Sequence, residues 1–252
     1  MSDATTLSDA VSSIEETANR KTNLETVDEK VSTAERRVER LSSDLDDLAD
    51  AIEELQFYRR ILADAFDGDV PAAVHSALED AKNAAATDRD ALVEQLRDES
   101  TTALQADIED TTDSVEHATR RVKKRLNDQY WSKWDERISS AQELQEIIGV
   151  HNTEFANTIK EIERYIKKHM RDPEENASNV VSGWQKVTEQ WEQHQDLQGM
   201  SAFQETHGLS DEAVSVVQQL SQDSVTLAEV ELNVLDELKD IPDLEAAVTL
   251  EI

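Results

Sequence analysis

The sequence predicts an all-α protein, and three observations support that prediction. Only five Gly and three Pro occur in 252 residues, so the chain has few of the residues that tight turns require. Helix-forming and helix-capping residues, chiefly Ala, Leu, Glu, Asp, Ser and Thr, dominate the composition. Apolar residues also recur with a helical period over long stretches. We therefore expect a few long helices joined by few turns.

The strongest periodic signal is a heptad repeat near the N-terminus. Its apolar residues alternate three and four positions apart without interruption, and the positions between them are nearly all polar or charged. The repeat consists of Leu24, Val27, Val31, Ala34, Val38, Leu41, Leu45, Leu48, Ile52 and Leu55. A sustained period of 3.5 residues keeps these side chains on one side of an under-wound helix. A partner helix is needed to cover that seam.

The first helix is expected to end near Phe66. The residues that follow, 67–71, combine a glycine with a proline that suits the first turn of a new helix. The apolar period then resumes, and no Gly or Pro interrupts residues 72–148. Two long helices joined by a short turn pack against each other in opposite directions. The sequence therefore predicts an antiparallel coiled-coil hairpin over residues 1–130.

The rest of the chain divides into two further predicted regions. Residues 131–198 open with aromatic residues and continue with amphipathic helical patterns, which indicates a helical head. Residues 199–252 form a small C-terminal unit, in which Ser210 is placed to cap a helix. Two short helical patterns alternate there with two stretches typical of strands, residues 225–227 and 246–252. This order of elements is compatible with a winged-helix-like module.

The net charge of −31, from 56 acidic and 25 basic residues, has two explanations. A high net charge with low hydrophobicity favours disorder. Adaptation to a high-salt cytoplasm is the other explanation, and the even spread of Asp and Glu with few Lys resembles the composition of proteins from extremely halophilic archaea. The strong apolar period favours an ordered, salt-adapted protein, because a disordered chain has no core for such a period to fill.

The sequence also bears on the location of the protein. The first residues are polar and acidic, without the basic and apolar segments of a signal peptide. No apolar run reaches the length of about 18 residues that a membrane-spanning helix needs. We therefore expect a cytoplasmic protein that does not bind a membrane.

No recognisable catalytic, cofactor or metal site is present in the sequence. The absence of Cys excludes disulfides, zinc–thiolate sites and thiol nucleophiles. The five glycines form neither a phosphate-binding loop nor a dinucleotide fingerprint, and no Ser lies in a Gly-x-Ser-x-Gly elbow. None of the six His follows a Glu by three positions, as the two-metal sites of helical bundles require. We therefore expect a protein that is not an enzyme and that has no cofactor or metal.

Two basic runs, near residues 120–137 and 160–171, stand out in this acidic sequence, with aromatic residues beside them. Basic and aromatic side chains together can bind nucleic acid through phosphate contacts and base stacking. The same cations can instead pair with acids of the chain, since the predicted hairpin brings Lys123 near Glu15, or they can contact a protein partner. Salt weakens electrostatic binding of nucleic acid, which favours pairing within the chain. The candidate contact residues are Arg120, Arg121, Lys123, Lys124, Arg125, Trp131, Trp134, Lys167 and Lys168.

Trp184 and Trp191 lie seven residues apart on one face of a predicted helix, with Val187 between them. Such a stripe is more often a core face, here against the helices of residues 134–171. The alternative is an interface anchor, because Trp is enriched among the residues that dominate binding energy.

Three classes of function remain. A heptad over Leu24–Leu55 with short helices over Leu209–Leu238 resembles the coiled-coil regions of SMC-like and phage-defence ATPases. That resemblance implies an accessory subunit of a nucleic-acid-processing or defence machine, and it carries no site residue because nucleotide-binding motifs are absent from the sequence. The sequence favours a non-enzymatic scaffold or adaptor that positions one or more protein partners. An enzyme with an unrecognised site is the third class.

Overall fold

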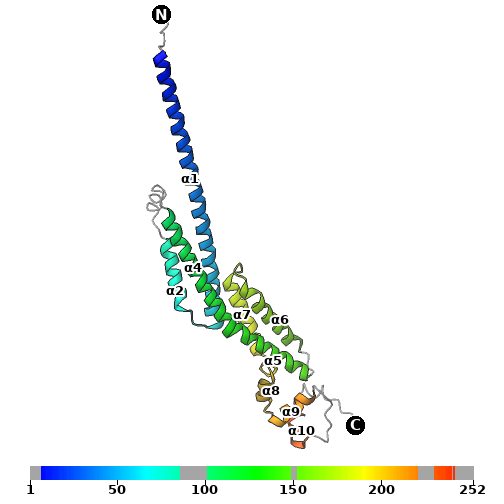
Figure 1. The fold of residues 1–252 in the computed structure, drawn as a ribbon. Coiled ribbons are helices and arrows are strands. Elements are labelled where there is room, and N and C mark those ends of the chain that lie inside the picture. Colours follow the sequence, from blue (N-terminus) through cyan, green and yellow to red (C-terminus); the bar gives the residue numbers. More distant parts are fainter. Residues whose placement is uncertain (1–6, 86–100, 149–151, 221–229, 240, 242–252) are drawn as a thin grey trace. The chain divides into compact units, whose positions relative to one another are not determined.

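The structure is a computed structural model of the chain, and every regular element in its described residues is a helix. No strand occurs among those residues, which confirms the all-α class. The described residues are 7–85, 101–148, 152–220, 230–239 and 241. They form two compact units, which are described separately below and are drawn in Figure 1. The first unit comprises Met1–Ile52 with His75–His117, and the second Glu53–Val74 with Ala118–Ile252.

The first unit contains parts of three helices. These are α1 (Leu7–Arg60), α2 (Ala72–Ala85) and α4 (Thr101–Leu126). Apolar side chains from all three helices are buried in it, namely Leu41, Leu48, Ala77, Ala81, Leu104, Ile108 and Val115. The Gln105 amide of α4 donates a hydrogen bond to the Asp44 carboxylate of α1 at 3.2 Å. In its described residues the unit therefore packs three helices together rather than a pair.

This arrangement corrects the predicted register of the hairpin. We expected one helix after the turn, but α2 ends at Ala85 and α4 begins at Thr101, with residues 86–100 outside the described part of the chain. Later residues of α4 pair with later residues of α1, so the two helices run in the same direction. The two pairs that show this are Asp44 with Gln105 and Glu54 with Lys123.

The connection after α1 has the predicted position. Helix α1 continues as a π-helix, η1 (Ile61–Ala65), that is followed by Phe66. The left-handed φ of 48° belongs to Asp67. Gly68 is needed for close approach instead, because a β-carbon there would lie 2.7 Å from the Tyr130 hydroxyl. Helix α2 then begins directly after Pro71, as the first-turn preference of proline predicts.

The second unit, called the head from here on, joins the predicted head of residues 131–198 to the ends of α1 and α4 and to the predicted C-terminal unit of residues 199–252. A π-helix, η2 (Asn127–Trp131), leads from α4 into the head. Two short 3₁₀ helices, η3 (His169–Arg171) and η4 (Gln195–Leu197), follow α6 and α7. The main helices of the head are α5 (Ser132–Ile148), α6 (Thr153–Lys167), α7 (Ala177–Glu192), α8 (Met200–His207), α9 (Asp211–Leu220) and α10 (Leu232–Leu238).

An aromatic cluster forms the centre of the head. Trp134 of α5 packs edge-on against Trp184 and Trp191 of α7, with ring centroids 5.1 and 5.4 Å apart. Phe155 of α6 reaches Trp191 at 5.2 Å. Aromatic pairs in such tilted and edge-on arrangements add about 0.5–1.5 kcal/mol beyond the area that they bury. The few aromatic residues of the chain are therefore concentrated where α5, α6 and α7 meet.

The C-terminal part of the head has the two predicted helices. The hydroxyl of Ser210 accepts a hydrogen bond from the Ala213 amide at 3.2 Å, which confirms the predicted cap of α9. Glu237 of α10 in turn accepts hydrogen bonds from the Ser210 amide and hydroxyl, both at 2.8 Å. The strands expected at 225–227 and 246–252 lie outside the described residues.

Candidate protein-interaction surface

The heptad repeat of α1 is only half covered by the rest of its unit. With Leu24 at heptad position a, the d positions Leu41 and Leu48 are 5% and 2% exposed. The a positions from Leu24 to Leu45 are exposed, and Val38 and Leu45 are still 50% and 40% exposed. Packing within the unit therefore covers the d positions from Leu41 onward, whereas the a positions from Leu24 to Leu45 and the earlier d position Val27 stay exposed.

The uncovered residues form a continuous apolar stripe, which we call the open seam. It consists of Leu24, Val27, Val31, Val38 and Leu45. Among the described residues, seven large hydrophobic side chains are exposed, and five of them belong to this seam. At a rise of about 1.5 Å per residue, the seam is about 32 Å long. A solvent-exposed apolar patch of this kind indicates a binding surface.

The open seam lies in a nearly neutral part of a strongly acidic chain. Residues 20–45 contain six basic side chains, which are Arg20, Lys21, Lys30, Arg36, Arg37 and Arg40. The same stretch contains six acidic side chains, which are Glu25, Asp28, Glu29, Glu35, Glu39 and Asp44. The whole chain has more than twice as many acids as bases. Electrostatic repulsion of an acidic partner is therefore weaker here than over the chain as a whole.

The basic runs in the head are partly used within the chain. The Lys123 ammonium lies 2.8 Å from the Glu54 carboxylate and 4.7 Å from the ring centroid of Tyr58. The pKa of Lys123 is raised: burial acts to lower it, but the hydrogen bond to Glu54 and the charges of Glu54 and Tyr58 outweigh burial. Lys123 thus pairs with Glu54 and not with Glu15, which corrects the partner predicted from the hairpin.

Other candidate cations differ in their surroundings. Lys167 pairs with Glu163 at 3.0 Å, and the Arg125 guanidinium donates to Gln129 at 3.0 Å. Four candidates are exposed, and their side chains make no hydrogen bond or ion pair with other described residues, namely Arg120, Arg121, Lys124 and Lys168. Three of these lie on α4 at spacings that place them on one face of the helix.

The candidate aromatic residues are buried in the head. Trp131 and Trp134 are 3% and 9% exposed, and guanidinium groups cover their rings. Arg171 lies 4.3 Å from the Trp131 ring and Arg137 lies 4.2 Å from that of Trp134. No open ring face is thus left for stacking on a base. Trp184 and Trp191 lie in the same aromatic cluster and are 2% and 0% exposed, so they pack in the core of the head rather than on its surface.

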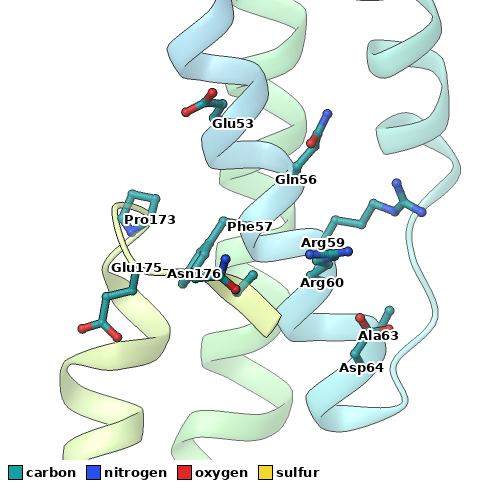
Figure 2. A pocket seen from close by; sticks show the side chains of 11 residues that line it. Glu53, Gln56, Phe57, Arg59, Arg60, Ala63, Asp64, Pro173, Glu175 and Asn176 are labelled. Carbon is teal, nitrogen blue, oxygen red and sulfur yellow. The ribbon is translucent and has the colours of Figure 1, made fainter. Parts of the chain in front are cut away.

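The head also contains an open groove that the sequence did not indicate. Figure 2 shows it between the C-terminal end of α1 and the loop that precedes α7. Its volume is about 670 Å³, and Arg59 and Arg60 lie among its lining residues with Glu53, Asp64 and Glu175. The Arg60 guanidinium donates to the Ser178 hydroxyl at 2.9 Å. No local motif could have predicted the groove, because its two walls are more than 100 residues apart in sequence.

The groove has no features of a catalytic or metal site. Its acids and bases are mixed, and its lining is mostly exposed to solvent. No group of three or more His, Asp or Glu side chains in the described residues is placed to hold a metal ion. None of the described helices is long and apolar enough to cross a membrane. Among these surfaces, the exposed apolar side chains of the open seam most clearly indicate that a partner binds there.

Comparison with known proteins finds no family model, no curated protein and no solved structure that matches this chain. The functional argument therefore rests on the residues and on their geometry.

Proposed function

We propose that this protein is a non-enzymatic helical scaffold that binds a protein partner through the open seam of α1. The observation that carries the proposal is the exposure of the a positions beside covered d positions, such as Val38 at 50% beside Leu41 at 5%. A heptad seam of this kind is completed by an α-helix, whose side chains insert between those of the seam. The head, with its own aromatic core, would then be held at a fixed place on the partner.

The chemistry of the seam suits an environment of high salt, which the composition indicates. At an ionic strength of 1 M the screening length is about 3 Å, so contacts between charged surfaces are weak. Apolar contacts do not weaken in this way, and salting-out ions strengthen them. A scaffold that binds through an apolar seam would therefore keep its partner where an electrostatic binder would lose it.

The alternative is an accessory subunit of a nucleic-acid-processing or phage-defence ATPase machine. The observation in its favour is the exposed cationic face of α4, formed by Arg120, Arg121 and Lys124. That face could contact phosphates, but the buried Trp131 and Trp134 would not supply base stacking. The resemblance of the heptad to the coiled coils of such machines also supports this alternative.

The scaffold proposal is tested by purifying a tagged chain from its native cell at native salt, after nuclease treatment. The variant Val31→Glu/Val38→Glu places two charges in the open seam. The matched control Thr26→Glu/Thr33→Glu places two charges at exposed positions that lie outside the a and d rows. We expect one protein at constant stoichiometry with the wild type and the control, and its loss with the seam variant. Equal recovery with both variants would refute the role of the seam.

A further inference from the structure

The open seam carries information about its own partner. We propose that a second copy of this chain packs on it, as a parallel two-stranded coiled coil over Leu24–Leu45. This inference rests on the proposed binding role of the seam and identifies the occupant. It follows from three features of α1: the residue types at the core positions, the signs of the flanking charges, and the local charge balance.

The core positions favour two strands. Val31 and Val38 occupy consecutive a positions, and β-branched residues at a favour parallel dimers, in which the side chain packs parallel to the helix pair. Both are half exposed in the single chain, so they are free to pack against a copy. At the C-terminal end Leu41 is already covered, and Leu45 would contribute from the a side alone.

The flanking charges favour the parallel direction. Over residues 24–37, Asp28 and Glu35 occupy the e positions, whereas Lys30 and Arg37 occupy the g positions; Asp44 at the next g position accepts a hydrogen bond from Gln105 within the chain. In a parallel pair a g residue faces the e residue of the next heptad of the other strand, so Lys30 faces Glu35 of the second copy, and this attractive pair forms twice. In an antiparallel pair e faces e and g faces g, which would place acid beside acid and base beside base. Like charges in contact disfavour that orientation.

The local charge balance allows two such acidic chains to approach. Each copy has a net charge of −31, yet the seam lies where basic and acidic side chains nearly cancel. Full overlap of the two seams covers every a position from Leu24 to Leu45, whereas a stagger of one heptad leaves one end of each seam in water. We therefore expect the two copies to align in register.

The first test is the mass of the intact chain in solution, measured by light scattering after size-exclusion chromatography in high salt. We expect the mass of two chains for the wild type and for Thr26→Glu/Thr33→Glu, and the mass of one chain for Val31→Glu/Val38→Glu. Circular dichroism checks that both variants keep the helical content of the wild type. A single-chain mass for the folded wild type would overturn the proposal.

The second test is the direction of the two strands. The natural sequence contains no Cys, so Leu24→Cys and Val38→Cys each introduce a single thiol per chain. In a parallel, in-register pair every residue faces its own copy, and a short bifunctional thiol reagent should cross-link both variants. In an antiparallel pair at most one of the two positions can face itself. Cross-linking of only one variant, or of neither, in a chain of dimeric mass would overturn the parallel arrangement.

These outcomes are distinguishable from failure of the scaffold proposal. Suppose that the wild-type chain is a monomer and that Val31→Glu/Val38→Glu abolishes co-purification of a different protein. That result would refute the second copy as the occupant of the seam, but it would support the scaffold proposal. A dimer that both variants form equally would refute the second copy as occupant of the seam, whereas the binding role of the seam is refuted only by equal recovery of a protein partner with both variants.

Discussion

The phenol ring of Tyr165 on α6 lies directly against the backbone of Gly183 on α7. A β-carbon at residue 183 would stand 2.7 Å from Cζ of that ring and closer still to its hydroxyl oxygen. The ring itself is held between His169 and Trp184, with centroid separations of 5.0 and 6.3 Å. Glycine inside a helix is about 1 kcal/mol less favourable than alanine. Its presence in the middle of α7 is explained by the close approach of the two helices.

The change Gly183→Ala should therefore destabilise the protein, although the same change stabilises most helices. We expect a loss of about 1–3 kcal/mol in the free energy of unfolding, as overpacked cores show. Denaturant unfolding measures it, with Ser182→Ala at an exposed neighbouring position as the control. In a Tyr165→Ala background the loss should shrink, because the clash is gone. A gain in stability from Gly183→Ala alone would show that the ring moves away freely.

The two sides of the α1 heptad should respond differently to truncation. Leu48 is 2% exposed, so Leu48→Ala should lower the free energy of unfolding by about 2–5 kcal/mol. Leu24 is 65% exposed, and in the dissociated chain Leu24→Ala should change the free energy of unfolding by less than about 0.5 kcal/mol. Denaturant unfolding at low protein concentration measures both. Equal losses would mean that Leu24 is covered within the single chain.

Glu237 should make the C-terminal helices sensitive to acid. The pKa of its carboxyl is lowered, first by the hydrogen bond from the Ser210 amide and second by that from the Ser210 hydroxyl. A lowered pKa means that the ionised form stabilises the fold; this contribution is present above the unfolded pKa of about 4.3 and is lost as pH falls through the lower folded value.

The change Glu237→Gln should thus destabilise α9 and α10 near neutral pH. The difference between the wild type and this variant should shrink as the solution is acidified. Amide hydrogen exchange of the two helices measures the effect at several pH values. Glu231→Gln, at an exposed residue that makes no side-chain cap to α10, is the control and should change little. If the difference in hydrogen exchange between the wild type and Glu237→Gln stays constant with pH, the ionised Glu237 carboxylate is not what stabilises these helices.

The cationic face of α4 tests the alternative function. The variant Arg121→Glu/Lys124→Glu/Arg125→Glu reverses three charges near it. If the protein is a scaffold, neither the wild type nor this variant should retain DNA or RNA at native salt, because counterion release makes such binding weak in salt. Filter binding over a salt series measures this. Retention by the wild type that the variant loses would favour the accessory-subunit function instead.

Several local features could be predicted from the sequence because short-range chemistry determines them. The end of the first helix near Phe66, the start of α2 after Pro71 and the cap of α9 by Ser210 all agree with the structure. Each of these depends on residues within a few positions of one another. Backbone hydrogen bonds and the conformational limits of Gly and Pro act over that range.

Longer-range features could not be predicted in the same way. The pairing of Lys123 with Glu54 rather than with Glu15 depends on the direction of α4, and no residue near Lys123 specifies that direction. The same holds for Trp131 and Trp134, whose spacing fits an exposed stacking surface as well as a core.

By itself, the sequence determined that this protein is helical, acidic and equipped with a heptad seam on its first helix. These properties follow from composition and from a period of 3.5 residues, which any α-helix converts into a stripe. Only the tertiary structure decided which side of that stripe is covered. Packing in the three-helix unit buries Leu41 and Leu48 at the d positions and leaves Leu24, Val31 and Val38 at the a positions open to solvent. A heptad predicts that another helix covers its apolar side chains. How many of them are covered within the chain depends on how the helices of the unit pack.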